Sequence, residues 1–460
     1  MEKKVAMEEK KAIIIGAGLV GSLWAVYLSK AGYTVTIFEG RSDIRLAEIS
    51  AGKSINLALS TRGWKALDTV GVGDEVRKIA IPMFGRTMHS VAGDLSYQPY
   101  GEKDQAIYSI SRGGVNSLMM DIAEKKGGAT IHYNMKCIDA DTEKGSVTLK
   151  NSITGKITEA TADVVFAADG AFSAVRYNAF QKIDRFNYSQ KYIGDGYREL
   201  LLPANDDGSY QLDKNSLHIW PRGKFMLIAL ANEGGSFTCT LFMPHDGDKN
   251  AFDKINTPEE VDTFFKSTFP DFYDMMPDIN ESWENHSLSS LAIMRSEPWH
   301  HGKTVLMGDA AHATVPFYGQ GMNGGFEDCT VLWEIMLKHT DGENNVNWEA
   351  TFNEYSEVRK PDGDALQDLS LYNYYVMRDY VADPKFLLQK KIEANFSKLY
   401  PDKWMPLYSQ VTFSNIRYSE ALKNGKRQSK IMDAVMQMEN IEEKWESEEV
   451  INTILEKLDQ

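Results

Sequence analysis

The sequence predicts an α/β protein with a parallel sheet, an inserted antiparallel sheet and a helical C-terminal region. A βαβ unit is indicated by an apolar run at 12–15, a glycine cluster, a helical pattern to residue 31 and an apolar run at 33–38. Further buried-strand runs lie at 163–169 and 304–307. Strand-like segments separated by turn residues, at 216–220, 225–231 and 237–243, indicate an antiparallel meander. Beyond about residue 340 the pattern is helical to the end.

The order of these segments predicts a discontinuous first domain. A chain of 460 residues exceeds what one hydrophobic core usually holds, so two or three domains are expected. We expect a dinucleotide-binding domain at 1–72, 101–180 and 293–340, a substrate domain at 73–100 and 181–292, and a helical region at 341–460. The last stretch, Ile431 to Gln460, has the spacing of one amphipathic helix.

Composition narrows the class of protein. The net charge of -15, from 65 acidic and 50 basic side chains, disfavours a nucleic-acid partner. Three cysteines without a CxxC pair favour a reducing compartment, and His300-His301 lacks ligand spacing, so no metal site is expected. Residues 1–10 lack the apolar segment of a secretory signal, and no apolar run reaches the length of about 18 residues that a membrane anchor needs. We therefore expect a cytoplasmic protein.

The glycine cluster after the first strand predicts a dinucleotide site. Gly16 permits a tight turn, Gly18 lets the backbone approach a pyrophosphate, and Gly21 lets the helix pack closely on its strand. Glu39 ends the second strand, where an acid accepts hydrogen bonds from a ribose without a 2′-phosphate, which favours FAD or NAD over NADP. The alternative is a glycine-rich turn with no ligand.

Two later motifs also follow buried strands. Asp169-Gly170 is followed by Ser173 and Arg176, a pattern that also fits a strand ending in a turn with a capped helix after it. Gly308-Asp309-Ala310-Ala311-His312 leads into Pro316 and the loop 319–323. His312 is expected to order this loop and not to transfer protons.

These three motifs, in this order, resemble the class A flavoprotein monooxygenases. The resemblance implies a Rossmann-like FAD domain of the GR2 type, tightly but non-covalently bound FAD, and NADPH that visits without a Rossmann domain of its own. The helix beginning near Met322 would point its positive end at the flavin. The cofactor-binding residues implied are Gly16, Gly18, Val20, Gly21, Glu39, Arg41, Ala58, Arg112, Asp169, Gly170, Asp309, Met322 and Asn323.

Narrower strings resemble the kynurenine 3-monooxygenase branch of that class. They lie at 52–60, 217–222, 237–244, 315–323 and 408–414. The resemblance implies hydroxylation of L-kynurenine at ring carbon 3 with NADPH and dioxygen through a flavin hydroperoxide, in tryptophan degradation and NAD biosynthesis. A homodimer is left open as the assembly.

The same resemblance implies a set of site residues. Arg86 would clamp the amino acid carboxylate, with Tyr100, Asn373 and Tyr408 as further substrate contacts. Asn373 also places an amide on the apolar helical stripe of Leu366, Leu369 and Met377, so it needs partners from the core or a ligand. The oxygen-transfer face would be shaped by Pro316, Phe317, Tyr318, Gly319 and Gln320. Phe84 departs from the family, which often has a basic residue there, and Tyr318 stands where relatives vary.

Two alternatives keep parts of this pattern. A flavoprotein hydroxylase or halogenase for another aromatic acid would keep the three FAD motifs without a reason to keep Arg86 and Tyr100. A non-enzymatic binder on the same fold, like the GDP-dissociation inhibitors, would have no need of intact Asp169-Gly170 and Gly308-Asp309.

Overall fold

The computed structural model describes residues 9–46, 56–101, 105–247, 249–380 and 383–459. Residues 1–8 and 52–55, used in the sequence analysis, therefore lie outside the described residues. By its contacts the chain divides into two compact units. The first is Met1–Ile81, Tyr108–Ile193 and Ala292–Gln367, and the second is Pro82–Ile107, Gly194–Leu291 and Asp368–Gln460. The finer division into three domains stays a prediction.

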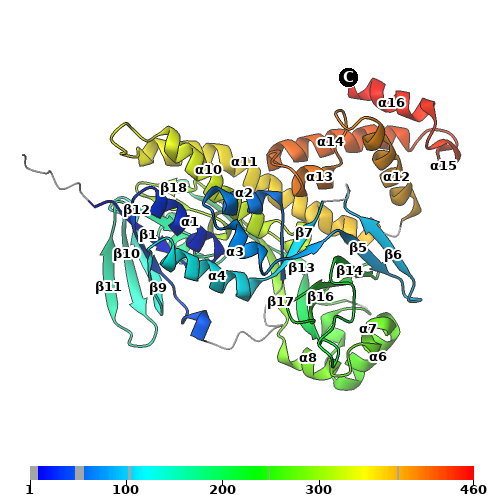
Figure 1. The fold of residues 1–460 in the computed structure, drawn as a ribbon, viewed down its shortest axis with the longest axis horizontal. Coiled ribbons are helices and arrows are strands. Elements are labelled where there is room, and N and C mark those ends of the chain that lie inside the picture. Colours follow the sequence, from blue (N-terminus) through cyan, green and yellow to red (C-terminus); the bar gives the residue numbers. More distant parts are fainter. Residues whose placement is uncertain (1–8, 47–55, 102–104, 248, 381–382, 460) are drawn as a thin grey trace, which may run out of the picture. The chain divides into compact units, whose positions relative to one another are not determined.

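The central sheet of the first unit holds the predicted parallel strands (Figure 1). Its strand order is β18–β19–β12–β1–β2–β8, and neighbours are parallel except β18 and β19. Ile14 pairs with both Phe166 and Ile37, and all three are fully buried. The βαβ unit and its two distant strands are therefore confirmed. The strands are β1 (Lys11–Ile15), β2 (Thr34–Phe38), β8 (Thr130–His132), β12 (Val164–Ala167), β18 (His300–His301) and β19 (Thr304–Leu306).

Helices of the first unit cover this sheet. Helix α1 (Leu19–Lys30) contacts both α4 (Arg112–Lys125) and α10 (Gly321–Lys338). Trp24 of α1 meets Phe166 of β12 edge-on at 5.3 Å, so α1 packs directly on the sheet. The shorter helices are α2 (Thr61–Thr69), α3 (Gly73–Arg77), α5 (Ala174–Asn178) and α9 (Asp309–His312). Smaller sheets contain β3 (Asn56–Leu59) paired with β7 (Ile107–Ser111), and β9 (Met135–Asp141), β10 (Ser146–Asn151) and β11 (Ile157–Thr161).

The predicted meander forms the middle of a seven-stranded sheet in the order β17–β13–β16–β15–β14–β5–β6. The pairs β13–β16, β16–β15, β15–β14 and β5–β6 are antiparallel, whereas β5 runs parallel to β14. This pairing is sterically allowed because β5 and β14 are more than a hundred residues apart, far more than a crossover requires. The strands are β5 (Gly85–His89), β6 (Leu95–Pro99), β13 (Asn187–Leu202), β14 (Ser216–Pro221), β15 (Met226–Ala231), β16 (Phe237–Pro244) and β17 (Ser289–Glu297), and β4 (Ile81–Met83) precedes β5.

Helices α6 (Pro258–Thr268), α7 (Pro270–Asp274) and α8 (Ile279–Asn285) form a layer on this sheet. Ring contacts join Trp220 of β14 to Phe272 of α7 at 5.6 Å, and Phe225 to Phe264 of α6 at 5.9 Å. Contacts between aromatic side chains therefore hold these helices against the seven-stranded sheet.

The C-terminal part is helical, as predicted, but the single helix expected from Ile431 to Gln460 is wrong. The elements are α11 (Trp348–Tyr375), a π-helical turn (Val376–Tyr380), α12 (Pro384–Leu399), α13 (Leu407–Thr412), α14 (Tyr418–Val435), α15 (Ile441–Lys444) and α16 (Glu448–Leu458). Asn440 adopts a left-handed φ of 55° before α15, and Ser447 caps α16 through the N–H of Val450. These local signals break the helix, because a left-handed residue cannot continue it. Among the described helices, none is long and apolar enough to span a membrane.

Candidate active site

The turn between β1 and α1 requires glycine at two of its three motif positions. Gly16 has a φ of +99°, and a Cβ there would lie 2.6 Å from the carbonyl oxygen of Ala168. A Cβ on Gly21 would lie 2.1 Å from the carbonyl oxygen of Gly16. Gly18 differs, because a Cβ built there meets no atom within 4 Å. Gly16 and Gly21 are thus needed by the fold itself, and Gly18 leaves an open approach to the first turn of α1, as a pyrophosphate requires.

Glu39 follows β2 and is held as a buried carboxylate. It accepts hydrogen bonds from the backbone N–H of Ala17 at 2.9 Å and from Arg41 Nε at 2.8 Å. Burial alone would raise the pKa of Glu39, but the bonds from Arg41 and Ala17 hold it below its ordinary value. An ionised carboxylate has further lone pairs for ribose hydroxyls, and Arg41 is placed beside it.

The Asp169-Gly170 motif is followed by a capped helix, which is one of the interpretations that the sequence allowed. Asp169 Oδ2 accepts the N–H of Ala174 at 2.7 Å at the start of α5, and burial raises the pKa of Asp169. The other oxygen, Oδ1, is buried and has no hydrogen-bond partner among the described residues, so it can accept from a ligand. The motif's arginine joins the two later motifs, because Arg176 Nη1 donates to the carbonyl of Ala310 at 2.6 Å.

Gly308 and Asp309 form the turn after β19. Gly308 has a φ of 56°, and a Cβ there would lie 2.9 Å from Val20 Cγ2, so glycine is required. The Asp309 side chain is exposed, yet the protein around it raises its pKa by desolvation, and Arg112 opposes that rise. Val20 and Arg112, both predicted cofactor residues, are therefore close to this turn.

The loop 316–323 is tied to the end of β3 by one amide side chain. Asn323 is fully buried; its Oδ1 accepts the N–H of Ser60 at 2.9 Å, and its Nδ2 donates to the carbonyls of Ala58 at 2.8 Å and Gly319 at 2.9 Å. Gln320 Nε2 donates to Ser60 Oγ at 3.2 Å. Four predicted residues thus meet around Ser60, which the sequence analysis missed because a serine after a strand carries no distinctive signal.

The rest of this loop is packed against protein. Pro316–Tyr318 form a single 3₁₀ turn that ends at Gly319 with a φ of 65°. Phe317 and Tyr318 are buried, as is Met322 in the first turn of α10. Helix α10 begins without a side-chain cap, so the positive end of its dipole can stabilise negative charge on a bound ring.

The residues of the first unit fit FAD. The open turn at Gly18, the carboxylate of Glu39 and the unpartnered Oδ1 of Asp169 are groups that a dinucleotide would satisfy. Within the part of the chain that the structure describes, no group of three or more His, Cys, Asp or Glu side chains is arranged to hold a metal.

The second unit brings Arg86 together with aromatic side chains, a group we call the Arg86 cluster: Arg86, Tyr100, Tyr408 and Phe413. The Arg86 guanidinium lies 4.5 Å from the Tyr408 ring centroid and 5.3 Å from that of Tyr100. The two tyrosine rings stack at 5.5 Å and 13°, and Phe413 lies 6.0 Å from each. The sequence analysis missed Phe413, although it lies in the string at 408–414.

Polar atoms in the Arg86 cluster lack protein partners. Arg86 Nε and the Tyr100 hydroxyl are buried, and no described residue meets hydrogen-bond geometry with either. Burial raises the pKa of Tyr100 well above its ordinary value, so the hydroxyl keeps its proton and can donate. An unpartnered N–H of the guanidinium cation, with an unpartnered hydroxyl beside it, suits a carboxylate.

Asn373 and Phe84 are the remaining residues of interest in the second unit. Asn373 is buried on α11, and its Nδ2 lies 3.4 Å from Met377 Sδ, in agreement with the predicted stripe. Phe84 is 39% exposed, and its backbone N–H donates to Asn215. The role of Asn373 in substrate binding stays a prediction.

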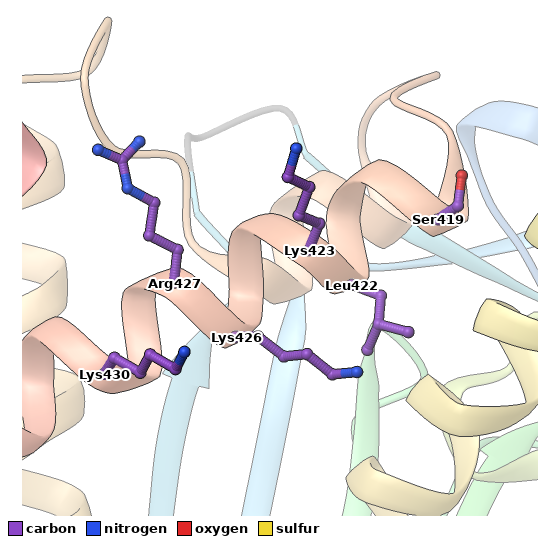
Figure 2. A pocket seen from close by; sticks show the side chains of 6 residues that line it. All are labelled: Ser419, Leu422, Lys423, Lys426, Arg427 and Lys430. Atoms are coloured by element: carbon purple, nitrogen blue, oxygen red, sulfur yellow. The ribbon is translucent and has the colours of Figure 1, made fainter. Parts of the chain in front are cut away.

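A separate hollow of about 430 Å³ lies on α14 (Figure 2). Its lining residues recur at helical spacing on one face, and the four cations among them are exposed. They are Ser419, Leu422, Lys423, Lys426, Arg427 and Lys430. Exposed cations on one face are typical of a solvated helix surface, so we do not place the active site there.

Comparison with known proteins first defines the class. A family model described as an FAD binding domain matches residues 9–370. The fold is similar to that of 2-methyl-3-hydroxypyridine-5-carboxylic acid oxygenase, with a TM-score of 0.65 and 19% identity over 85% of this chain and 98% of that one. It is also similar to a Klebsiella pneumoniae HpxO variant solved with FAD, with a TM-score of 0.63 and 18% identity over 84% of this chain and 94% of that one. The chain therefore belongs to the class of FAD-dependent aromatic-ring hydroxylases.

More similar relatives define the family. Kynurenine 3-monooxygenase from Flavobacterium psychrophilum is 48% identical over 452 residues, which is 98% of this chain and 99% of the relative. The enzyme of the same name from Sus scrofa is 42% identical over 92% of this chain and 88% of its own length. The chain belongs to the kynurenine 3-monooxygenase family.

Proposed function

We propose that this protein hydroxylates L-kynurenine at ring carbon 3, giving 3-hydroxy-L-kynurenine with consumption of NADPH and dioxygen. The observation that carries the proposal is the Arg86 cluster, whose unpartnered donors suit the carboxylate of an amino acid. The FAD-binding residues of the first unit and the family of the chain support the same reaction.

The roles of the side chains follow from their chemistry. Bound FAD supplies the redox chemistry, taking reducing equivalents from NADPH and passing them to dioxygen. Arg86 and Tyr100 bind the substrate carboxylate, and the Tyr408 ring holds the guanidinium plane in place. Asn373 is a further substrate contact in this proposal. The buried side chains of the loop 316–320, which are Phe317, Tyr318 and Gln320, exclude water from the oxygen-transfer face.

No strong catalytic base is needed in this reaction. The aniline nitrogen of kynurenine already activates the ring carbon beside it, so the protein has to orient the ring and exclude water. NADPH acts as a transient co-substrate, because only the GxGxxG string at 16–21 lies between the strand and the helix of a βαβ unit, and FAD would occupy it. The second GxGxxG string, at 319–324, follows a 3₁₀ turn and not a strand. The three free, buried cysteines support a reducing compartment such as the cytoplasm.

The test is NADPH oxidation by the purified yellow protein with and without L-kynurenine, with the product identified by mass and retention time. We expect kynurenine to stimulate oxidation and 3-hydroxykynurenine to appear in step with it. Stimulated oxidation that yields only hydrogen peroxide would assign the enzyme to another aromatic acid. A colourless protein that takes up no FAD would instead favour a non-enzymatic binder on this fold.

A further inference from the structure

A buried ionic cluster lies behind the turn at Gly308. It contains three carboxylates and two guanidinium groups, and Asp328, Arg359 and Arg62 are its most buried members, with 0%, 1% and 1% of their surface exposed. Arg359 also binds Glu327 at 2.9 Å and Asp362 at 3.4 Å, and Arg62 binds Glu327 at 2.5 Å. A buried cluster of this kind costs desolvation, so its contacts must be nearly complete to be tolerated.

One oxygen of Asp328 binds both ends of the turn at 308–312. Oδ2 accepts the backbone N–H of Gly308 at 2.9 Å and lies 2.7 Å from His312 Nε2. Asp309 lies between these two residues and is exposed. His312 is itself held in place, because its ring lies 5.1 Å from that of Trp299 and because a Cβ on Gly363 would lie 3.2 Å from its own Cβ.

The other oxygen of Asp328 connects the turn to α10 through Arg359. Oδ1 accepts from Arg359 Nε at 2.9 Å and Nη2 at 2.7 Å. The same Nη2 donates to the carbonyl of Gly324, in the first turn of α10, at 3.2 Å. Asp328 therefore has two accepted bonds on each oxygen and links the turn that carries Asp309 to the helix end that carries Asn323.

The carboxylate of Asp328 is kept ionised in this setting. Burial alone would raise its pKa, but His312 and Arg359 outweigh burial and lower it. The cluster has three carboxylates and two guanidinium groups, so its acidic side chains outnumber its guanidinium groups by one.

We propose that Asp328, backed by Arg359, is the positioning residue of the flavin site: it fixes the turn at 308–312 against the first turn of α10 and so sets the affinity for FAD and the reduction potential of the bound flavin. The proposal rests on the proposed function only in requiring FAD. Asp328 acts through Gly308, His312 and Arg359, and its negative charge opposes the negative charge that reduction places on the ring.

The test compares Asp328→Asn with Glu327→Gln. Each removes one carboxylate charge from the cluster, but only Asp328 bonds the turn at Gly308 and His312. For Asp328→Asn we expect the FAD dissociation constant to rise about tenfold or more, which corresponds to the loss of one charge-assisted hydrogen bond. We also expect the reduction potential of the flavin to become more positive. For Glu327→Gln we expect an FAD dissociation constant near wild type and a smaller shift of the potential, because a charge is removed without loss of a bond to the turn.

A second pair of variants covers the case in which Asp328→Asn does not fold. His312→Gln keeps a hydrogen-bond donor for Asp328 Oδ2, whereas His312→Phe removes it. We therefore expect weaker FAD binding and a shifted flavin potential in His312→Phe, and values closer to wild type in His312→Gln. Equal losses of melting temperature in Asp328→Asn and Glu327→Gln, with wild-type FAD affinity and potential in both, would reduce Asp328 to a structural residue. These readouts need neither kynurenine nor NADPH, so a protein that bound FAD but left kynurenine unchanged would refute the proposed function alone.

Discussion

At the scale of single residues, the Arg86 side chain is arranged for a ligand before the ligand arrives. Its guanidinium lies 4.5 Å from the Tyr408 ring centroid, and the neighbouring Tyr100 hydroxyl is buried without a partner among the described residues. Stacking on an aromatic ring limits the rotation of the guanidinium plane, so little side-chain entropy remains to be lost when a carboxylate binds.

Replacing Arg86 by alanine is expected to raise the dissociation constant for L-kynurenine about 10- to 100-fold, because one charged hydrogen-bond partner is lost. Arg86→Lys keeps the charge but loses the planar fork, and it should fall between wild type and Arg86→Ala. Calorimetric titration of the FAD-loaded protein measures the change. Lys214→Ala, which removes an exposed cation from the same unit, serves as the matched control and should bind as wild type. Wild-type affinity in Arg86→Ala would remove this residue from the substrate site.

At the scale of elements, the glycines of the β1–α1 turn have separable tasks. A methyl group on Gly21 would collide with the carbonyl of Gly16, but one on Gly18 meets nothing within 4 Å, and the φ of -73° at Gly18 is ordinary for alanine. The fold therefore tolerates a side chain at one position of the motif and excludes it at another.

Gly18→Ala should leave the FAD-free protein as stable as wild type, within about 0.5 kcal/mol, and should weaken FAD binding about tenfold or more. The added methyl would occupy the approach of the pyrophosphate. Gly21→Ala should instead lower the melting temperature of the FAD-free protein or prevent folding. Thermal melts and FAD fluorescence titrations separate the two effects. If Gly18→Ala bound FAD like wild type, the turn would not be the pyrophosphate site.

At the scale of the whole molecule, the free energy of unfolding should decrease as the pH is lowered, partly because of one buried histidine. His218 is 2% exposed, and burial lowers its pKa to about 4; its Nδ1 meets His89, and its Nε2 meets the carbonyl of Asp213. Between about pH 6.5 and 4 the unfolded chain binds a proton at this residue and the folded chain does not. The free energy of unfolding should therefore fall over that window, by about 3 kcal/mol from this group.

His218→Gln should flatten this part of the profile relative to wild type. Denaturant unfolding at a series of pH values measures it, and the loss below about pH 4 should persist because ionised carboxylates such as Asp271 and Asp328 are protonated there. His132→Gln, at an exposed histidine, is the control and should follow wild type. An unchanged slope in His218→Gln would show that other groups cause the acid loss.

The sequence by itself determined the elements and the motifs of this protein. Apolar runs gave the parallel strands, turn residues gave the meander, and Gly16, Gly21 and Gly308 stand where a side chain would collide with the backbone or with Val20. These features depend on the residue types within a short window, which periodicity and spacing report directly. The break of the last helix was missed, although Asn440 and Ser447 are residue types that favour the left-handed and capping positions they occupy.

Only the tertiary structure decided which side chains meet. Asn323 bonds Ala58, Arg176 bonds Ala310, and Arg86 lies against Tyr408, and each pair is separated by more than a hundred residues. The sequence did not indicate which residues Asp328 and Phe413 would contact in the fold. An acid on a helix, or a phenylalanine after one, can pack against many different partners. A sequence specifies what a side chain can bond, whereas the register of sheets and the packing of helices select its partner.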